Sequence, residues 1–75
     1  MRGYIVVIEG DDEIGYSAYS PDLPGVVAAA ETRAEVGPLM RSAMAAHIAF
    51  LRSEGDPVPE PSEIADVEVF DPTAA

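Results

Sequence analysis

Hydrophobic and polar positions divide the chain into three strand-like runs, one helix-like run and a final strand-like run. The first run, residues 4–9, contains four consecutive β-branched residues, and apolar side chains alternate onto both of its faces. We therefore expect a central strand covered on both sides. Residues 14–20 predict a second strand, which is antiparallel to the first because the acidic turn between them is short. Residues 26–31 predict a third strand.

A rigid connection precedes the third strand. Pro21 and Pro24 have no backbone N–H and fix their own φ angles, so neither can donate to a sheet ladder. Asp22 can accept hydrogen bonds from nearby backbone N–H groups, and Gly25 can take a positive φ. Leu23 is the one apolar side chain that could pin the turn onto a core. These five residues therefore predict a structural corner.

The helix-like run has a start signal and a conflict close to it. Thr32 and Glu35 have the spacing of a capping box, which would place Pro38 in the second helical turn. Either the helix has a short first turn and bends near Gly37, or it begins later with Pro38 in its first turn. The helix is expected to end near Gly55. Its predicted apolar face consists of Val36, Met40, Ala43, His47 and Leu51.

The C-terminal third is proline-rich and acidic. Three prolines make residues 55–62 an expected extended linker. Residues 64–70 alternate between apolar and polar and predict an edge strand, followed by a loose tail at 71–75. The expected order is β-β-β-α-β in a single α+β domain spanning residues 1–75.

The net charge of the chain indicates which kind of partner it can bind. The chain has 14 Asp and Glu residues against 4 Arg and no Lys, which gives a formal net charge of −10. Such a chain should repel nucleic acid and favour a basic partner, although acidity can also serve solubility alone. Without cysteine, disulfides and thiolate metal sites are excluded, so a domain of this size is expected to gain stability by association. No apolar run is long enough to span a membrane and no signal peptide is recognisable, so we expect a cytoplasmic protein.

Several groups have two interpretations. His47 has no recognisable catalytic partner in the sequence, and we expect a packing or interface role for it. The acidic turn at 10–13 lacks the pattern of a calcium loop and is expected to be a solvated turn. Met40 and Met44 are expected to fill the core, with adaptable partner binding as the alternative. The carboxylates between Glu54 and Asp71 form either a solvated segment or a partner-docking strip.

The order of these elements resembles the HicB-like antitoxins of bacterial toxin–antitoxin pairs. The resemblance spans about residues 3–70 and is carried by Tyr16, Tyr19, the block Pro21-Asp22-Leu23-Pro24-Gly25, the Thr-started helix and the proline-rich exit ending at Ser62. It implies a partial ribonuclease-H-like fold, in which a fourth strand lies beside the first. It also implies a partner, because family members inhibit HicA-like toxins, which are small basic proteins that cleave messenger RNA.

The sequence departs from this family in three places. Val26 stands where members often have Cys, and the pair Gly37-Pro38 interrupts a helix that is usually continuous. Many members also have a C-terminal DNA-binding domain, for which a chain ending at Ala75 leaves no room, so no direct nucleic-acid binding is expected. Ribonuclease H chemistry needs an acidic residue inside the first strand, whereas here Glu9 lies at its end. Kinship of fold therefore does not imply activity.

These observations favour a non-enzymatic antitoxin, without a cofactor or metal, that forms a dimer or tetramer and binds a small basic toxin. The expected partner-binding residues are Tyr16, Tyr19, Glu63, Asp66 and Glu68, and the expected structural residues are Pro21, Asp22, Leu23, Pro24, Gly25, Thr32 and Glu35. One alternative is a self-associating structural or ligand-binding domain of the same fold. A metal-dependent nuclease that uses Glu9 is the least favoured interpretation.

Overall fold

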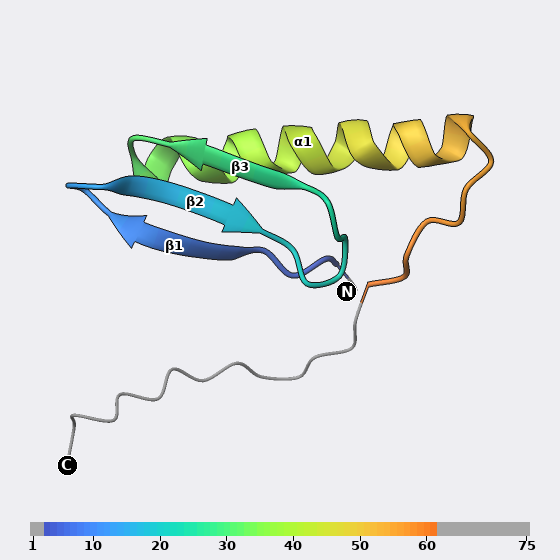
Figure 1. The fold of residues 1–75 in the computed structure, drawn as a ribbon, viewed down its shortest axis with the longest axis horizontal. Helices are drawn as coiled ribbons and strands as arrows, with labels where there is room; N and C mark the ends of the chain where they lie inside the picture. The colour runs from blue at the N-terminus through green and yellow to red at the C-terminus, as the bar shows by residue number, and fades with distance from the viewer. Residues whose placement is uncertain (1–2, 62–75) are drawn as a thin grey trace, which may run out of the picture.

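A three-stranded antiparallel sheet and one helix make up the fold in the computed structural model, which describes residues 3–61. The sheet has the order β1-β2-β3 (Figure 1). The elements are β1 (Val7–Asp11), β2 (Gly15–Tyr19), β3 (Val27–Ala30) and α1 (Arg33–Ser53). This confirms the predicted α+β class, the three antiparallel strands and the helix. The predicted strand at 64–70 and the tail at 71–75 lie outside the described residues.

Strand β1 begins and ends later than the sequence predicts. Its ladder starts where Val7 pairs with Tyr19, the last residue of β2, because the chain turns away after that residue. The backbone N–H of Ile5 donates instead to the Asp22 carboxylate, at 2.7 Å. In the described sheet β1 is an edge strand, so its expected central position depends on a further strand from outside these residues.

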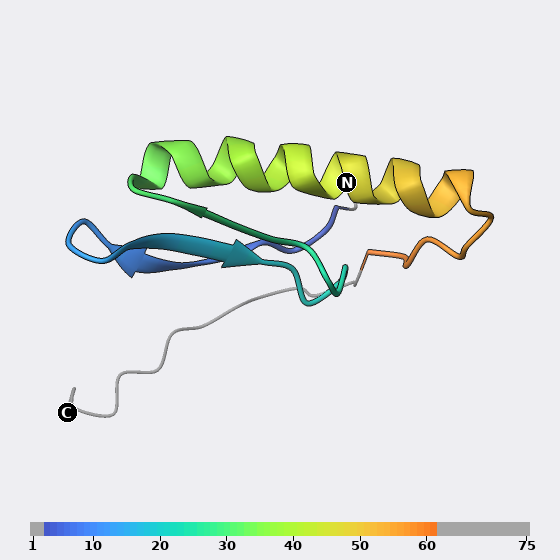
Figure 2. The same cartoon turned by 45° about the horizontal axis from the view of Figure 1, so that its top comes forward.

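The helix lies along one face of the sheet (Figure 2). Its side chains Val36 and Met40 are fully buried against the strands, and Met44 is nearly so. The two methionines therefore fill the core, as expected. The buried apolar cluster consists of Ala18, Leu23, Val26, Val36, Met40 and Met44. His47 is half-buried and lines an open groove together with Val26 of this cluster.

The helix begins at its early start signal rather than at Pro38. Thr32 is the N-cap, and its hydroxyl accepts from the backbone N–H of Glu35 at 3.2 Å. The same hydroxyl donates to the Glu35 carboxylate at 2.7 Å. Pro38 therefore lies inside the helix, and the alternative of a later start is wrong. Gly37 precedes it and has no Cβ to crowd the proline ring, which makes a helical conformation at this position less costly.

The end of the helix has the hydrogen-bond pattern of a Schellman motif. Gly55 has a φ of 72°, its N–H donates to the Arg52 carbonyl at 3.2 Å, and the Asp56 N–H donates to the Leu51 carbonyl at 2.9 Å. The expected helix end near Gly55 is confirmed. Beyond it, the Tyr4 hydroxyl donates to the Pro59 carbonyl at 2.6 Å, which ties the exit segment to the residues before β1.

The corner after β2 is held by hydrogen bonds to Ser20 at its start and by the buried side chain of Leu23. Ser20 is buried, its hydroxyl accepts from the Asp22 N–H at 3.2 Å, and its carbonyl accepts from the Leu23 N–H at 3.3 Å. Leu23 is 1% exposed and belongs to the core. Gly25 has a φ of 91°, a backbone angle that residues with a Cβ rarely adopt. Pro21 and Pro24 are exposed on the outside of the corner.

Candidate partner-binding site

A tight acidic turn joins β1 to β2 in a hairpin. Asp11 pairs with Gly15, and its carboxylate accepts from the backbone N–H groups of Glu13 and Ile14, both at 2.9 Å. Gly10 has a φ of 129°, and a Cβ at this position would collide with the Gly15 carbonyl. The chain therefore turns within three residues, and the loop side chains are directed outward.

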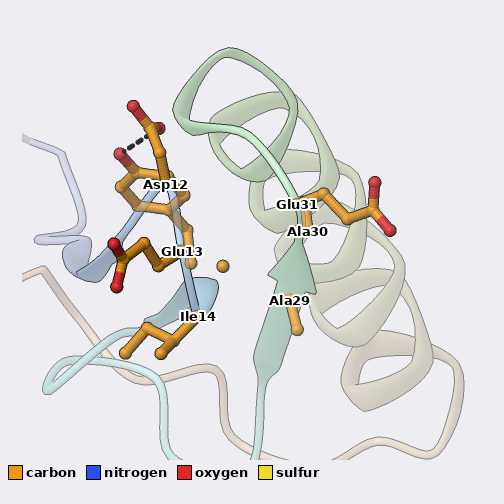
Figure 3. Close-up of a pocket in the computed structure, with 8 residues that line it drawn as sticks. Asp12, Glu13, Ile14, Ala29, Ala30 and Glu31 are labelled. Carbon is orange, nitrogen blue, oxygen red and sulfur yellow. Dashed lines mark hydrogen bonds between the residues drawn. The ribbon is translucent and has the colours of Figure 1, made fainter.

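An open groove of about 540 Å³ separates this hairpin from the end of β3. Asp12 and Glu13 line it on one side and Glu31 on the other, while Ala29 and Ala30 form its wall. Figure 3 shows the Glu13 and Glu31 carboxylates on opposite rims, pointing away from each other. We call this region the acidic hairpin end; it comprises Glu9, Asp11, Asp12, Glu13 and Glu31 together with Ile14.

Tyr16 closes one side of the groove. Its hydroxyl donates to the Asp12 carboxylate at 2.9 Å, drawn as the dashed line in Figure 3. This hydrogen bond raises the pKa of Tyr16 above its usual value, and partial desolvation and the negative charges of Asp12 and Asp11 act in the same direction. Arg33 at the start of the helix acts in the opposite direction. The phenol is therefore a hydrogen-bond donor to Asp12 at neutral pH.

Ile14 is the most exposed large apolar side chain of the described residues, at 82%. It lies at the junction between the groove and a smaller hollow of about 340 Å³, whose lining also includes Glu9, Ser17 and Ala29. An apolar side chain surrounded by carboxylates has the composition of a small docking patch, with an apolar centre and a charged rim.

Tyr19 lies on the other face of β2 from Tyr16, because successive residues of a strand alternate between faces. It is 42% exposed and forms a row with Val7 of β1 and Val27 of β3 on the sheet face away from the helix. The two expected contact tyrosines are therefore not brought together. Glu63, Asp66 and Glu68, the other expected contact residues, lie outside the described residues.

The sequence predicts that the acidic turn is a solvated loop and indicates no contact role for Ile14 or Glu31. A single exposed isoleucine between a run of carboxylates and a glycine is the local signal that could have identified the patch. Glu31 had no such signal, because it reaches the groove only through the pairing of β2 with β3.

Residues 3–61 contain no group of three or more His, Cys, Asp or Glu side chains placed to hold a metal ion. Glu9 is exposed and pairs across the sheet with Ser17. The helix within the same residues is not apolar enough over a sufficient length to cross a bilayer.

Comparison with known protein families identifies the class. Residues 4–72 match the model of the HicB-like antitoxins of bacterial toxin–antitoxin systems. The match covers nearly the whole chain, and the chain therefore belongs to the HicB-like antitoxin family. Neither the curated proteins nor the solved structures contain a match to it.

Proposed function

We propose that this protein is an antitoxin that binds and neutralises a small, basic, HicA-like toxin that cleaves messenger RNA, and that it has no catalytic activity of its own. Membership of the antitoxin family is the observation that carries this proposal. The proposal extends to a cytoplasmic location and to a single domain with a partial ribonuclease-H-like fold, in which residues 64–70 add a fourth strand beside β1.

Charge supports a basic partner. The chain has a formal net charge of −10. Three carboxylates of the acidic hairpin end, those of Asp12, Glu13 and Glu31, line the open groove, and Glu9 lines the adjoining hollow. Opposite charge accelerates encounter with a basic protein and disfavours RNA at the same surface. An RNA-cleaving toxin presents a positively charged surface to its substrate, and the antitoxin would cover that surface with carboxylates.

Ile14 would supply the apolar contact at the centre of this surface. Side chains that dominate binding energy lie near the centre of an interface and are surrounded by contacts that exclude water. The aliphatic part of a toxin Lys or Arg side chain would lie over Ile14 and Ala29, with its charged end at the carboxylate on one rim of the groove, that of Glu13 or Glu31. Tyr16 and Asp12 would form the fixed wall of this contact.

The proposal is tested with the toxin encoded beside this gene. We expect the two purified proteins to form a complex and the antitoxin to suppress RNA cleavage in proportion to its concentration. The affinity should fall as salt is raised, because salt screens attraction between exposed charges. A toxin that neither binds nor is inhibited at low salt would contradict the antitoxin function and leave a structural or ligand-binding domain of the same fold.

Matched variants locate the contact. Replacing Ile14 by Ala should weaken toxin binding by about tenfold or more, as expected for a central contact residue. The double variant Glu13→Gln/Glu31→Gln should weaken binding and reduce its salt dependence. The comparison pair is Glu54→Gln/Asp56→Asn, which makes the same change in net charge in the second acidic segment, at exposed positions beyond the C-terminal end of α1. Equal losses from the two double variants would show that net charge, and not the acidic hairpin end, determines binding.

The proposed antitoxin also self-associates, as a dimer or tetramer. A chain of 75 residues without cysteine buries a small core, and association is the remaining common way to stabilise such a domain. Large apolar side chains that stay exposed in the described residues, Leu39 and Phe50 among them, are consistent with this expectation.

A further inference from the structure

One flank of α1 carries an uncharged stripe. Leu39, Ala43, Ala46 and Phe50 recur at spacings of four, three and four residues, which places them in one row along the helix. We call these four residues the helix stripe. Leu39 is 50% and Phe50 56% exposed, and Ala46 is also exposed. In a chain with 24% charged residues, a row of this length without one is a distinct surface.

The helix stripe lies on the β3 side of the molecule. Ala43 and Ala46 line an open groove together with Gly25, Val26 and Val27, the residues that lead into β3. All of these side chains are small or apolar, and His47 is the one titratable residue in the lining. The uncharged surface therefore continues from the helix onto the start of the strand.

Strand β3 adds an independent observation on the same side. It is an edge strand of the described sheet, and alternate residues of an edge strand present unpaired N–H and C=O groups. Its sequence, Val-Ala-Ala-Ala, has no charge, proline or bulge, which are the features that usually protect such an edge from pairing. A second protein chain on this side would shield both the edge and the stripe.

We propose that the helix stripe is the interface between two copies of this chain related by a two-fold axis. In an antiparallel pair of α1 helices, Leu39 packs against Phe50 of the second copy, and Ala43 packs against Ala46 of the second copy. The stripe has the same spacing when read from either end, with large residues outside and small ones at the centre. An isologous interface requires this self-complementarity.

Chemistry favours a second copy over the basic partner. A basic protein would find no carboxylate within the stripe, whereas the acidic hairpin end offers several. The two alanines at the centre allow helix axes to approach to about 8 Å. The stripe extends over only about 16 Å of helix, which suits a weak dimer with a dissociation constant on the order of micromolar.

This inference rests on the proposed self-association but not on toxin binding, and the two interactions respond differently to salt. Copies with a net charge of −10 repel each other, so screening should strengthen the dimer. Binding to a basic toxin should weaken under the same change. A failure of one interaction is thereby distinguished from a failure of the other.

Sedimentation equilibrium of the purified chain tests the interface. The variant Ala46→Glu introduces two carboxylates close to the two-fold axis and should weaken the dimer by about tenfold or more. The control Ala45→Glu makes the same substitution at the neighbouring exposed position, which lies about 100° around the helix and outside the stripe. Circular dichroism verifies that both variants remain folded, and Phe50→Ala gives a second test without added charge.

We expect a concentration-dependent dimer in the wild type and in Ala45→Glu, and a monomer in Ala46→Glu. At concentrations where the wild type is itself a monomer, all three should bind toxin equally well. A wild type that stays monomeric at high salt over the micromolar range would overturn the proposal. Equal effects of the two glutamate substitutions would overturn it as well. So would loss of toxin binding in Ala46→Glu at concentrations where the wild type is a monomer, because the stripe would then be the toxin's contact surface.

Discussion

Replacing Pro38 by Ala should stabilise this protein. Proline in a helix interior costs up to about 3 kcal/mol relative to alanine, because it lacks an N–H and crowds the carbonyl four residues earlier. That carbonyl belongs to Ala34, which is exposed together with Pro38, so water can satisfy part of the lost hydrogen bond. We therefore expect a gain of about 1–2 kcal/mol in the free energy of unfolding.

Gly37 makes the prediction more specific, because its effect depends on Pro38. An added Cβ at Gly37 would lie 3.5 Å from the end of Arg41 and 3.7 Å from the end of Arg33, which are ordinary contacts with flexible side chains. Gly37→Ala should therefore gain about 1 kcal/mol when residue 38 is alanine. With Pro38 present, the proline ring crowds the new Cβ and most of that gain is lost. The two substitutions should be more stabilising together than the sum of the single effects.

Urea unfolding followed by circular dichroism measures all four proteins, at a concentration below that of the proposed dimer. A gain of 1–2 kcal/mol corresponds to a rise in melting temperature of roughly 4–16 °C for a domain of this size. Pro57→Ala is the matched control, since Pro57 is exposed and follows the helix. An unchanged or lower stability of Pro38→Ala would refute the reasoning. Pro38 would then behave as a residue of the first helical turn, where proline is tolerated without cost.

Three further predictions concern the corner and the groove. Leu23→Ala should lower the free energy of unfolding by about 2–5 kcal/mol, measured by urea denaturation, because Leu23 is 1% exposed within the core. Asp22→Ala should cost about 1.5–3 kcal/mol by the same assay, because it removes the carboxylate that accepts from the Ile5 N–H, while Asp22→Asn retains an acceptor oxygen and should cost less. Above pH 10, absorbance titration should show one tyrosine that ionises later than free tyrosine, and this component should be absent in Tyr16→Phe. Because the folded pKa of Tyr16 is the higher one, its contribution to stability is present below the unfolded pKa and is lost as the pH rises through the folded value.

The parts of the fold that sequence could predict depend on neighbouring residues. The hairpin follows from two strand-like runs around a short turn, and the helix start follows from Thr32 and Glu35 three residues apart. The helix end follows from Gly55 with a proline two residues later. In each case the residues that form the hydrogen bonds are close along the chain, so their types and spacing suffice.

Features that depend on distant pairing were harder to predict. The bounds of β1 differ from the expected run because the last residue of β2 fixes where the ladder begins. The acidic groove requires the hairpin to lie beside the end of β3, and nothing near Glu31 in the sequence indicates this. The helix stripe could not be predicted for another reason. Alanines are ordinary helix formers at exposed positions, and only the structure shows that Ala43 and Ala46 form a continuous uncharged surface with the start of β3.

The acidic hairpin end and the helix stripe share no residue, so one chain can present both surfaces at the same time. A dimer formed through the stripe would hold two acidic hairpin ends in a fixed relation and could bind two toxin molecules. The same carboxylates attract the basic toxin and cause the repulsion between the two copies. A toxin that neutralises the carboxylates of one copy would therefore reduce that repulsion. Toxin binding should therefore strengthen the dimer, and by reciprocity Ala46→Glu should reduce toxin affinity only under conditions in which the wild type is dimeric. At concentrations where the wild type is a monomer, the two proteins should bind toxin equally well.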